Sequence, residues 1–203
     1  MIGFIRYPRR SVARFGAACL LVLTALGAPQ AADRPPLGGD MKDFVLANPP
    51  RPGPEAGFTD LEGKELSLAD FRGKVVVLNL WATWCVPCIK EMPSLQRLSA
   101  KMRDRGVAVL ALSQDRAGAK LVTPFLEKHG LKTLPVYLDP KGLVLRAIAG
   151  RGLPTTVIYD QQGREVGRLE GDAEWDGPHA LALIEHVLAQ GKDTRPPLVK
   201  TVG

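Results

Sequence analysis

Two cysteines separated by two residues are the feature of this sequence with the most chemical potential. Cys85 and Cys88 lie within WATWCVPCIKEMP, residues 81–93, and the chain has only one other cysteine, Cys19. A disulfide between them would close a very short loop, which stabilises a fold poorly because loop-closure stabilisation grows with loop length. Reversible oxidation of such a pair can instead exchange electrons with another disulfide. The pair therefore predicts thiol-disulfide chemistry.

The segments on either side of the pair predict how it is held. VVVLNLW, residues 75–81, is an apolar run typical of a strand buried on both faces. Residues 87–102 carry apolar side chains at spacings of three and four, which predicts an amphipathic helix. These side chains are Ile89, Met92, Leu95, Leu98 and Met102. The cysteines are therefore expected where a buried strand ends and a helix begins.

A cysteine at the start of a helix is chemically activated. The first N–H groups of a helix lack partners and carry partial positive charge, which lowers the pKa of a thiol there. Pro87 suits the first turn because its missing N–H would have been unpaired anyway. Cys88 lies about one turn further on, on the same side. We therefore expect Cys85 to attack a partner's disulfide and Cys88 to resolve the mixed disulfide.

Metal binding is the main alternative for a Cys-x-x-Cys pair. A four-ligand zinc site needs two more Cys or His residues, but His129, His179 and His186 are scattered along the chain. Haem attachment needs a histidine directly after the second cysteine, and that position is Ile89. We expect no metal and no other cofactor, and we keep a Cu(I)-binding metallochaperone that uses the same two thiolates as the alternative function.

Residues 1–32 predict an export signal. They contain four arginines and no Asp, Glu or Lys, followed by an apolar run at 15–28 and then small residues. This order of charged, apolar and small residues is typical of a secretory signal. The run is shorter than the roughly 20 residues that span a bilayer, and an uncleaved N-terminal anchor is the alternative. Removing the four arginines from the formal charge of +6 leaves +2, which argues against nucleic-acid binding.

The rest of the chain predicts one α/β domain. Residues 33–57 are rich in Pro and Gly and predict a linker, with room for a short strand at 44–46. Residues 58–190 alternate predicted strands and helices, then end with a hairpin at 155–170 and a closing helix that Gly191 terminates. Residues 191–203 predict a disordered tail. This order implies a three-layer α/β/α sandwich around a mixed central sheet.

Two motifs in this domain resemble a known family. VVVLNLWATWCVPCIKEMPSLQRL and GLPTTVIYDQQGREVGRLEG together resemble the TlpA-like thiol-disulfide oxidoreductases of the thioredoxin superfamily, from about residue 58 to residue 190. The resemblance implies a thioredoxin-like fold and a periplasmic reductant of protein disulfides that receives electrons from a membrane donor. It also implies clients in cytochrome c or copper-oxidase maturation. An uncleaved N-terminal segment would tether such a protein to the inner membrane.

The resemblance also assigns roles to individual residues. It makes Cys85 the exposed attacking thiol and Cys88 the buried resolving thiol. It matches Pro154 to a cis-proline opposite the disulfide, which would leave the backbone of Leu153 free to pair with a substrate strand. Trp84 is expected to contact the partner, together with Val86 and Pro87, which also tune the reduction potential. Pro93 matches a proline that kinks the helix.

One position departs from thioredoxin itself. Thioredoxin has a buried aspartate where this chain has Asn79, and asparagine cannot titrate. Proton transfer must then pass to water or to another acid. Glu91 follows Cys88 by three residues and could lie near the thiols. We favour the other interpretation, an exposed glutamate in the first part of the helix that the helix dipole stabilises.

Overall fold

The computed structural model describes residues 35–193, with side chains described up to residue 191. The predicted signal at 1–32 and the end of the predicted tail lie outside the described residues. The strands are β1 (Val45–Pro52), β2 (Phe58–Asp60), β3 (Glu65–Leu66), β4 (Val75–Trp81), β5 (Val107–Ser113), β6 (Val136–Leu138), β7 (Thr155–Tyr159) and β8 (Arg164–Glu170). The helices are α1 (Val86–Met102), α2 (Ala119–Lys128), α3 (Leu143–Ala147) and α4 (Pro178–Asp193), with 3-10 turns η2 (Gly39–Met41), η3 (Leu68–Phe71) and η4 (Arg103–Arg105).

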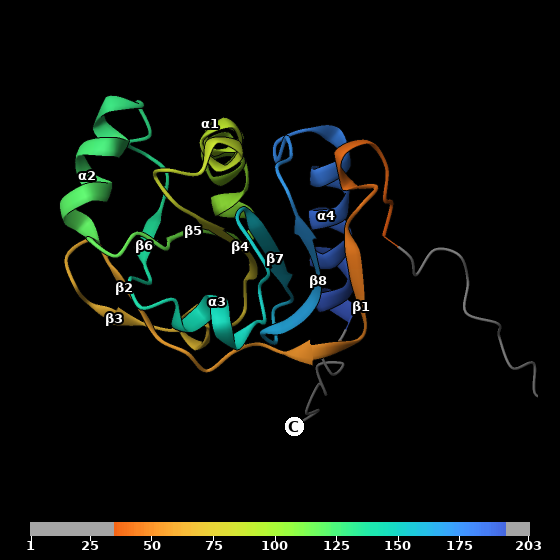
Figure 1. Cartoon of the computed structure of the whole chain (residues 1–203). Helices are drawn as coiled ribbons and strands as arrows, with labels where there is room; N and C mark the ends of the chain where they lie inside the picture. The colour runs from red at the N-terminus through yellow and green to blue at the C-terminus, as the bar shows by residue number, and fades with distance from the viewer. Residues whose placement is uncertain (1–34, 194–203) are drawn as a thin grey trace, which may run out of the picture. The chain divides into compact units, whose positions relative to one another are not determined.

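The strands form one mixed sheet, as the sequence predicts. Their order across the sheet is β1-β8-β7-β4-β5-β6-β2-β3. The neighbours β4, β5 and β6 run parallel, whereas the other paired strands run antiparallel. Parallel neighbours need crossover connections, which α1 and α2 supply between β4, β5 and β6 (Figure 1).

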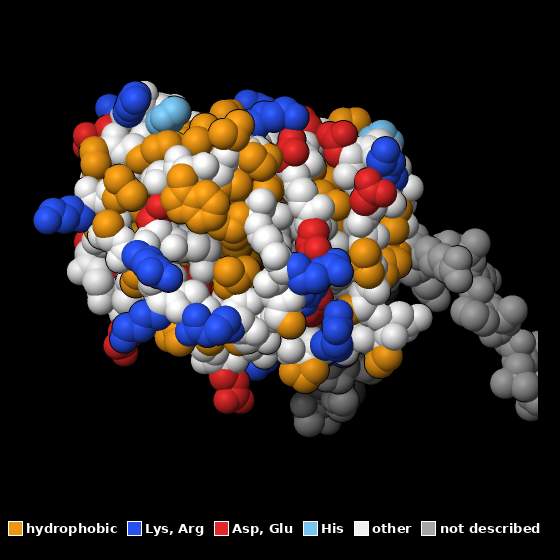
Figure 2. All heavy atoms as spheres, viewed as in Figure 1, with side chains coloured by type: hydrophobic (Ala, Val, Ile, Leu, Met, Phe, Trp, Pro, Cys, Tyr) orange, Lys and Arg blue, Asp and Glu red, His pale blue; other side chains and the backbone are white. Residues whose placement is uncertain are grey.

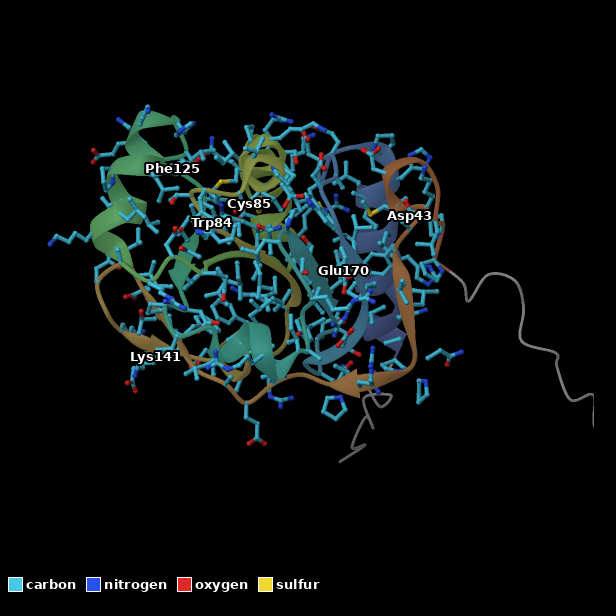
Figure 3. The ribbon with its side chains drawn as sticks, in the orientation of Figure 1. Asp43, Trp84, Cys85, Phe125, Lys141 and Glu170 are labelled. Carbon is cyan, nitrogen blue, oxygen red and sulfur yellow. A yellow bond between two sulfur atoms is a disulfide. The ribbon has the colours of Figure 1, made fainter. Side chains whose placement is uncertain are left out.

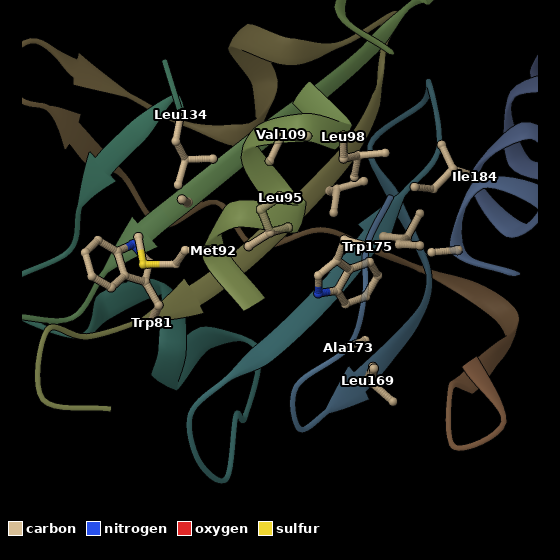
Figure 4. Packing of buried hydrophobic residues seen from close by; sticks show 14 of the residues in the cluster. Trp81, Met92, Leu95, Leu98, Val109, Leu134, Leu169, Ala173, Trp175 and Ile184 are labelled. Carbon is tan, nitrogen blue, oxygen red and sulfur yellow. The ribbon is translucent and has the colours of Figure 1, made fainter. Parts of the chain in front are cut away.

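Helices cover both faces of this sheet and give three layers. All seven residues of β4 are buried, because alternate side chains point to opposite faces and both faces are covered. Val77 lies in a core cluster with side chains of α1, α2 and α4. Leu78 and Leu80 lie in a second cluster with η3 and α3. Figure 1 shows α3 across the sheet from α1, and Figure 4 shows the first cluster around Trp81, Leu95 and Trp175. The predicted three-layer sandwich is confirmed.

The segment predicted as a Pro/Gly-rich linker instead joins the sheet. Residues 45–52 form β1, which pairs with β8, and Met41 and Phe44 before it are buried in the first core cluster. β1 contains Pro49, Pro50 and Pro52. Proline is tolerated there because β1 is an edge strand, so only one side of its backbone needs partners. The prediction of a linker from the high proline content is therefore wrong for residues 45–52, which form an edge strand.

The end of the domain also differs from the prediction. Gly191 was expected to end the closing helix, but α4 continues to Asp193. Glycine costs a helix about 1 kcal/mol relative to alanine, which the packing of the rest of the helix can offset. Within residues 35–193, no helix is both long enough and apolar enough to cross a membrane.

Candidate active site

The two cysteines form a disulfide at the start of α1. Cys85 is the N-cap residue of α1 with extended backbone angles, and the Cα atoms of Cys85 and Cys88 are 5.3 Å apart. The backbone N–H of Cys88 donates to Cys85 Sγ at 3.3 Å. This N–H belongs to the first turn of α1, where backbone N–H groups have no partner within the helix. It therefore donates to the sulfur that is predicted to be the nucleophile. This contact and the helix dipole both favour a thiolate at Cys85 in the reduced protein.

The disulfide is buried between neighbours that are exposed. Cys85 is 5% exposed and Cys88 is fully buried. Trp84 and Val86 are 69% and 76% exposed, and Pro87 is also exposed. The expectation that Cys85 is exposed is therefore wrong, because only 5% of the residue is accessible. The order of exposure, with Cys85 the more accessible of the two, agrees with the prediction.

The predicted cis-proline is present. The peptide bond between Leu153 and Pro154 is cis. Thr155, which follows, pairs with Leu80 in the antiparallel β7–β4 ladder. β7 therefore begins beside the end of β4, from which the chain continues toward Cys85. Pro154 is buried and Leu153 is half-buried.

Glu91 is buried, which corrects the expectation that it is solvent-exposed. It is 2% exposed, on the core side of α1. Its Oε2 accepts from the Trp175 indole N–H at 2.8 Å and from the Ala173 backbone N–H at 3.2 Å, and its Oε1 accepts from Asn79 Nδ2 at 2.7 Å. Burial raises the pKa of Glu91 to about 7, although these three hydrogen bonds oppose that rise.

Asn79 links this carboxyl to the sheet. Asn79 Nδ2 also donates to Thr156 Oγ1 at 2.8 Å on the neighbouring strand β7. Its Oδ1 is buried and has no hydrogen-bond partner among the described residues. Asn79 Oδ1 is therefore a hydrogen-bond acceptor without a partner among the described residues, and it lies on the side chain that bonds to Glu91, whose pKa is about 7. Asn79, at the position that the resemblance matches to thioredoxin's aspartate, is thus hydrogen-bonded to a glutamate of the adjacent helix.

A second buried carboxylate fixes the loop that carries Trp84 and Cys85. Asp115 is 3% exposed. It accepts from the Thr83 backbone N–H at 2.9 Å, from the Thr83 hydroxyl at 2.8 Å and from the Ser113 hydroxyl at 2.9 Å. Asp115 is a site residue that was not predicted from the sequence. Its position in the sequence could have indicated it, because Asp115 comes two residues after the end of the buried strand β5. The loops that follow adjacent parallel strands lie close together there.

No metal centre is evident in the part of the chain that the structure describes. No group of three or more His, Cys, Asp or Glu side chains there is arranged to hold a metal ion. The two sulfur atoms of Cys85 and Cys88 are bonded to each other. They could serve as metal ligands only after reduction.

A disulfide at the start of a helix, together with a cis-proline before a central strand of a mixed sheet, is typical of the thioredoxin-like class of proteins. The model of the AhpC/TSA family matches residues 38–164, so the chain belongs to that family. This match begins well before residue 58, which agrees with the inclusion of β1 in the sheet. The predicted relationship to TlpA-like thiol-disulfide oxidoreductases is confirmed by the names of the relatives.

Two curated relatives carry the same name, thiol-disulfide oxidoreductase ResA. The protein of Bacillus thuringiensis subsp. konkukian is 40% identical over 114 residues, 56% of this chain and 65% of the relative. That of Geobacillus kaustophilus is 41% identical over 127 residues, 63% of this chain and 65% of the relative. The matched region thus spans less than two thirds of the length of these relatives, 65% in both.

Solved structures agree on the fold. A protein from Chlorobium tepidum, described as the thiol:disulfide interchange protein DsbE, has a TM-score of 0.60 and 27% identity, covering 68% of this chain and 96% of that one. A DsbF homologue from Corynebacterium diphtheriae has a TM-score of 0.58 and 26% identity, covering 75% of this chain and 96% of that one. The thioredoxin-like fold predicted from the sequence is confirmed.

Proposed function

We propose that this chain is an exported thiol-disulfide oxidoreductase that reduces disulfides in other proteins. The observation that carries the proposal is the Cys85–Cys88 disulfide at the N-terminus of α1, where the Cys88 N–H donates to Cys85 Sγ. The names of the relatives and structural neighbours support the same chemistry. A helix start of this kind favours the thiolate that disulfide exchange requires.

The reaction transfers two electrons from the protein to its client. The Cys85 thiolate attacks one sulfur of the client disulfide, which breaks that bond, releases one client thiolate and forms a mixed disulfide. The Cys88 thiolate then attacks Cys85 Sγ, which releases the second client thiolate and forms the Cys85–Cys88 disulfide. The client is reduced and this protein is oxidised. An external dithiol donor must then restore the reduced form, and we assign that step to a membrane protein.

Glu91 is the proton acceptor that we assign to Cys88. The two residues are three apart in α1, so they share a helix face with Cβ atoms about 5–6 Å apart. Cys88 must lose its proton before it can attack Cys85, and a buried carboxyl with a pKa of about 7 can accept it near neutral pH. Glu91 thus supplies the acid that the replacement of thioredoxin's aspartate by Asn79 removed.

Docking of the client uses the exposed residues around the disulfide. Trp84, Val86 and Pro87 present an exposed apolar rim beside the buried cysteines. The backbone at Leu153, before the cis-proline and β7, is the segment that we assign to pairing with a client strand. We propose clients in cytochrome c or copper-oxidase maturation, reached outside the cytoplasm, with the N-terminal segment acting as a signal or as an anchor.

Trapping the mixed disulfide tests this function. In Cys88→Ala, Cys85 can still attack a client disulfide, but no second thiolate is present to resolve the mixed disulfide. Clients should therefore remain covalently attached to Cys85, and mass spectrometry can identify them. Cys85→Ser should trap nothing. In vitro, the reduced wild-type protein should reduce the disulfides of insulin, and Cys85→Ser should abolish this activity. A reduced protein that cannot reduce any disulfide, but retains Cu(I) tightly at one ion per chain, would instead establish the metallochaperone function.

A further inference from the structure

The surface around the disulfide divides into two halves that differ in their ion pairs. On the β8 side, Lys90 pairs with Asp172 at 2.7 Å and Arg151 pairs with Glu170 at 2.8 Å. On the opposite side lies the segment 114–146, which includes α2, β6 and the start of α3. Among the described residues, no lysine or arginine of this segment forms an ion pair with an acidic side chain.

The acidic residues of that segment are mostly hidden. Asp115 and Asp139 are 3% and 2% exposed. Both are occupied: Asp115 by the Thr83 loop, and Asp139 by backbone N–H groups at the start of α3. Glu127 is the one exposed acid between residues 114 and 146, whereas six lysines and arginines there are exposed. The segment itself therefore presents more positive than negative charge at its surface, and Glu65 and Asp70 of the neighbouring region line the same pocket as Lys141.

Four of these cations lie close to or within the two helices of the segment, Arg116 and Lys120 at α2 and Lys141 and Arg146 at α3. Arg116 directly follows Asp115, and the Asp115 carboxylate accepts hydrogen bonds from Thr83. Arg116 is therefore close to the loop that carries Trp84. Lys120 precedes the exposed Leu121 in α2. Arg146 donates to the Lys141 backbone carbonyl, which keeps these two residues together. In the common view of Figures 2 and 3, apolar side chains gather around Trp84 and Phe125, and basic side chains lie to the left of and below them, toward Lys141.

We infer that this face recognises a protein segment that carries acidic residues next to its disulfide. The apolar rim at Trp84 and Val86 would receive the apolar neighbours of the client's cysteines. Arg116, Lys120, Lys141 and Arg146 would face its carboxylates, which lie toward α2 and α3 rather than toward β8. Complementary charge of this kind mainly accelerates encounter and selects among partners. The inference rests on the proposed disulfide-reducing function and names the chemistry of its clients.

Two synthetic disulfide peptides test the inference. They share one cysteine pair and one length, and differ only in flanking residues, glutamate in one and lysine in the other. We expect the reduced protein to react with the acidic peptide about ten-fold faster or more at low ionic strength. The difference should shrink at high salt, because exposed charges are screened. Equal rates for the two peptides at low salt would overturn the inference.

A matched pair of charge reversals separates the local face from the net charge. Arg116 and Arg103 are both exposed, and neither has an ion pair within the described residues. Arg103 lies at the far end of α1, about 25 Å from Cys85. Arg116→Glu should remove most of the preference for the acidic peptide, and Arg103→Glu should keep it. If both substitutions have the same effect, overall charge explains the preference and the docking face is wrong.

A small neutral disulfide distinguishes this inference from the function on which it rests. Both variants should react with 2-hydroxyethyl disulfide at the wild-type rate, because that molecule has no charge to recognise. If the wild type reduces it but shows no preference between the peptides, only the inference about clients fails. If the wild type reduces no disulfide at all, the proposed function fails and the inference fails with it.

Discussion

The indole N–H of Trp175 donates a 2.8 Å hydrogen bond to the carboxyl of Glu91, which lies 84 residues earlier in the chain. Both side chains are buried. Lys90 pairs with Asp172, and Arg97 and Lys101 pair with Asp176. The loop between β8 and α4 is thus attached to α1 by buried and exposed contacts, and it controls the environment of the carboxyl that we assign to proton transfer.

Glu91 should make the stability of the oxidised protein depend on pH. Its pKa is raised from 4.5 to about 7 on folding, so the folded state binds the proton more tightly than the unfolded chain. The resulting stabilisation is fully present below about pH 4.5 and is lost as pH rises through about 7, a difference of about 3 kcal/mol. Glu91→Gln should remove this slope between pH 5 and pH 8, as measured by urea unfolding of oxidised protein.

The glutamine variant should fold because its neighbours can adapt. Its amide oxygen can accept from Trp175 and Ala173, and its amide N–H can donate to Asn79 Oδ1 if that side chain turns over, since this oxygen has no other partner among the described residues. Glu127→Gln, at an exposed position of α2, serves as the matched control and should keep the wild-type slope. Parallel pH profiles for the wild type and Glu91→Gln would show that the carboxyl is not buried as described.

Trp175→Phe should raise the pKa of Glu91 further. The indole hydrogen bond favours the charged carboxylate, so its loss favours the protonated form. A hydrogen bond to a charged group is worth about 1.5–3 kcal/mol, so the pH midpoint of the stability change should move up by about one to two units. The carbon-13 shift of the labelled Glu91 carboxyl can be followed directly by NMR.

Trp81→Phe is the control for that experiment. Trp81 is as fully buried as Trp175, but its indole nitrogen has no hydrogen-bond partner within the described structure. Both substitutions remove a similar volume from the core, so both should lower stability. Only Trp175→Phe should change the Glu91 midpoint. An equal shift in the two variants would assign the effect to core packing rather than to the hydrogen bond.

Thr83→Val should destabilise the loop before Cys85. Valine keeps the shape of threonine but removes the hydroxyl donor to Asp115 Oδ1, which leaves a buried carboxylate oxygen without its partner. The expected loss in the free energy of unfolding is about 1–3 kcal/mol. Thr123→Val, at an exposed position of α2, should cost much less. A double-mutant cycle with Asp115→Asn measures the coupling, and a coupling near zero would contradict the assigned contact.

The sequence predicts those parts of the site that depend on local pattern. The apolar run at 75–81 and the helical spacing after Pro87 each lie within one element, and the structure has both elements within a residue of the prediction. The cis-proline at Pro154 followed from the family resemblance and is present. Local periodicity and a matched motif were therefore sufficient to place the disulfide at the start of a helix.

Contacts distant in sequence account for the errors. Glu91 looked exposed because nothing near it in the sequence indicates that Asn79, Ala173 and Trp175 converge on it. A carboxyl in the first turns of a helix is normally solvated, and only tertiary contacts reverse that expectation. Asp115 was missed for the same reason, because its partner Thr83 belongs to another strand–helix connection.

Gly167→Ala tests the other correction, that residues 45–52 belong to the sheet. A Cβ at position 167 would lie against the Phe44 ring and the Val45 carbonyl, closer than real contacts allow. β1 would have to move away from β8, so we expect a loss of about 1–3 kcal/mol in unfolding free energy and faster amide exchange in β1. Gly152→Ala, where nothing lies within 4 Å of the added carbon, should leave both unchanged. If β1 exchanges as fast in the wild type as in the variant, the segment is the linker that its composition suggests.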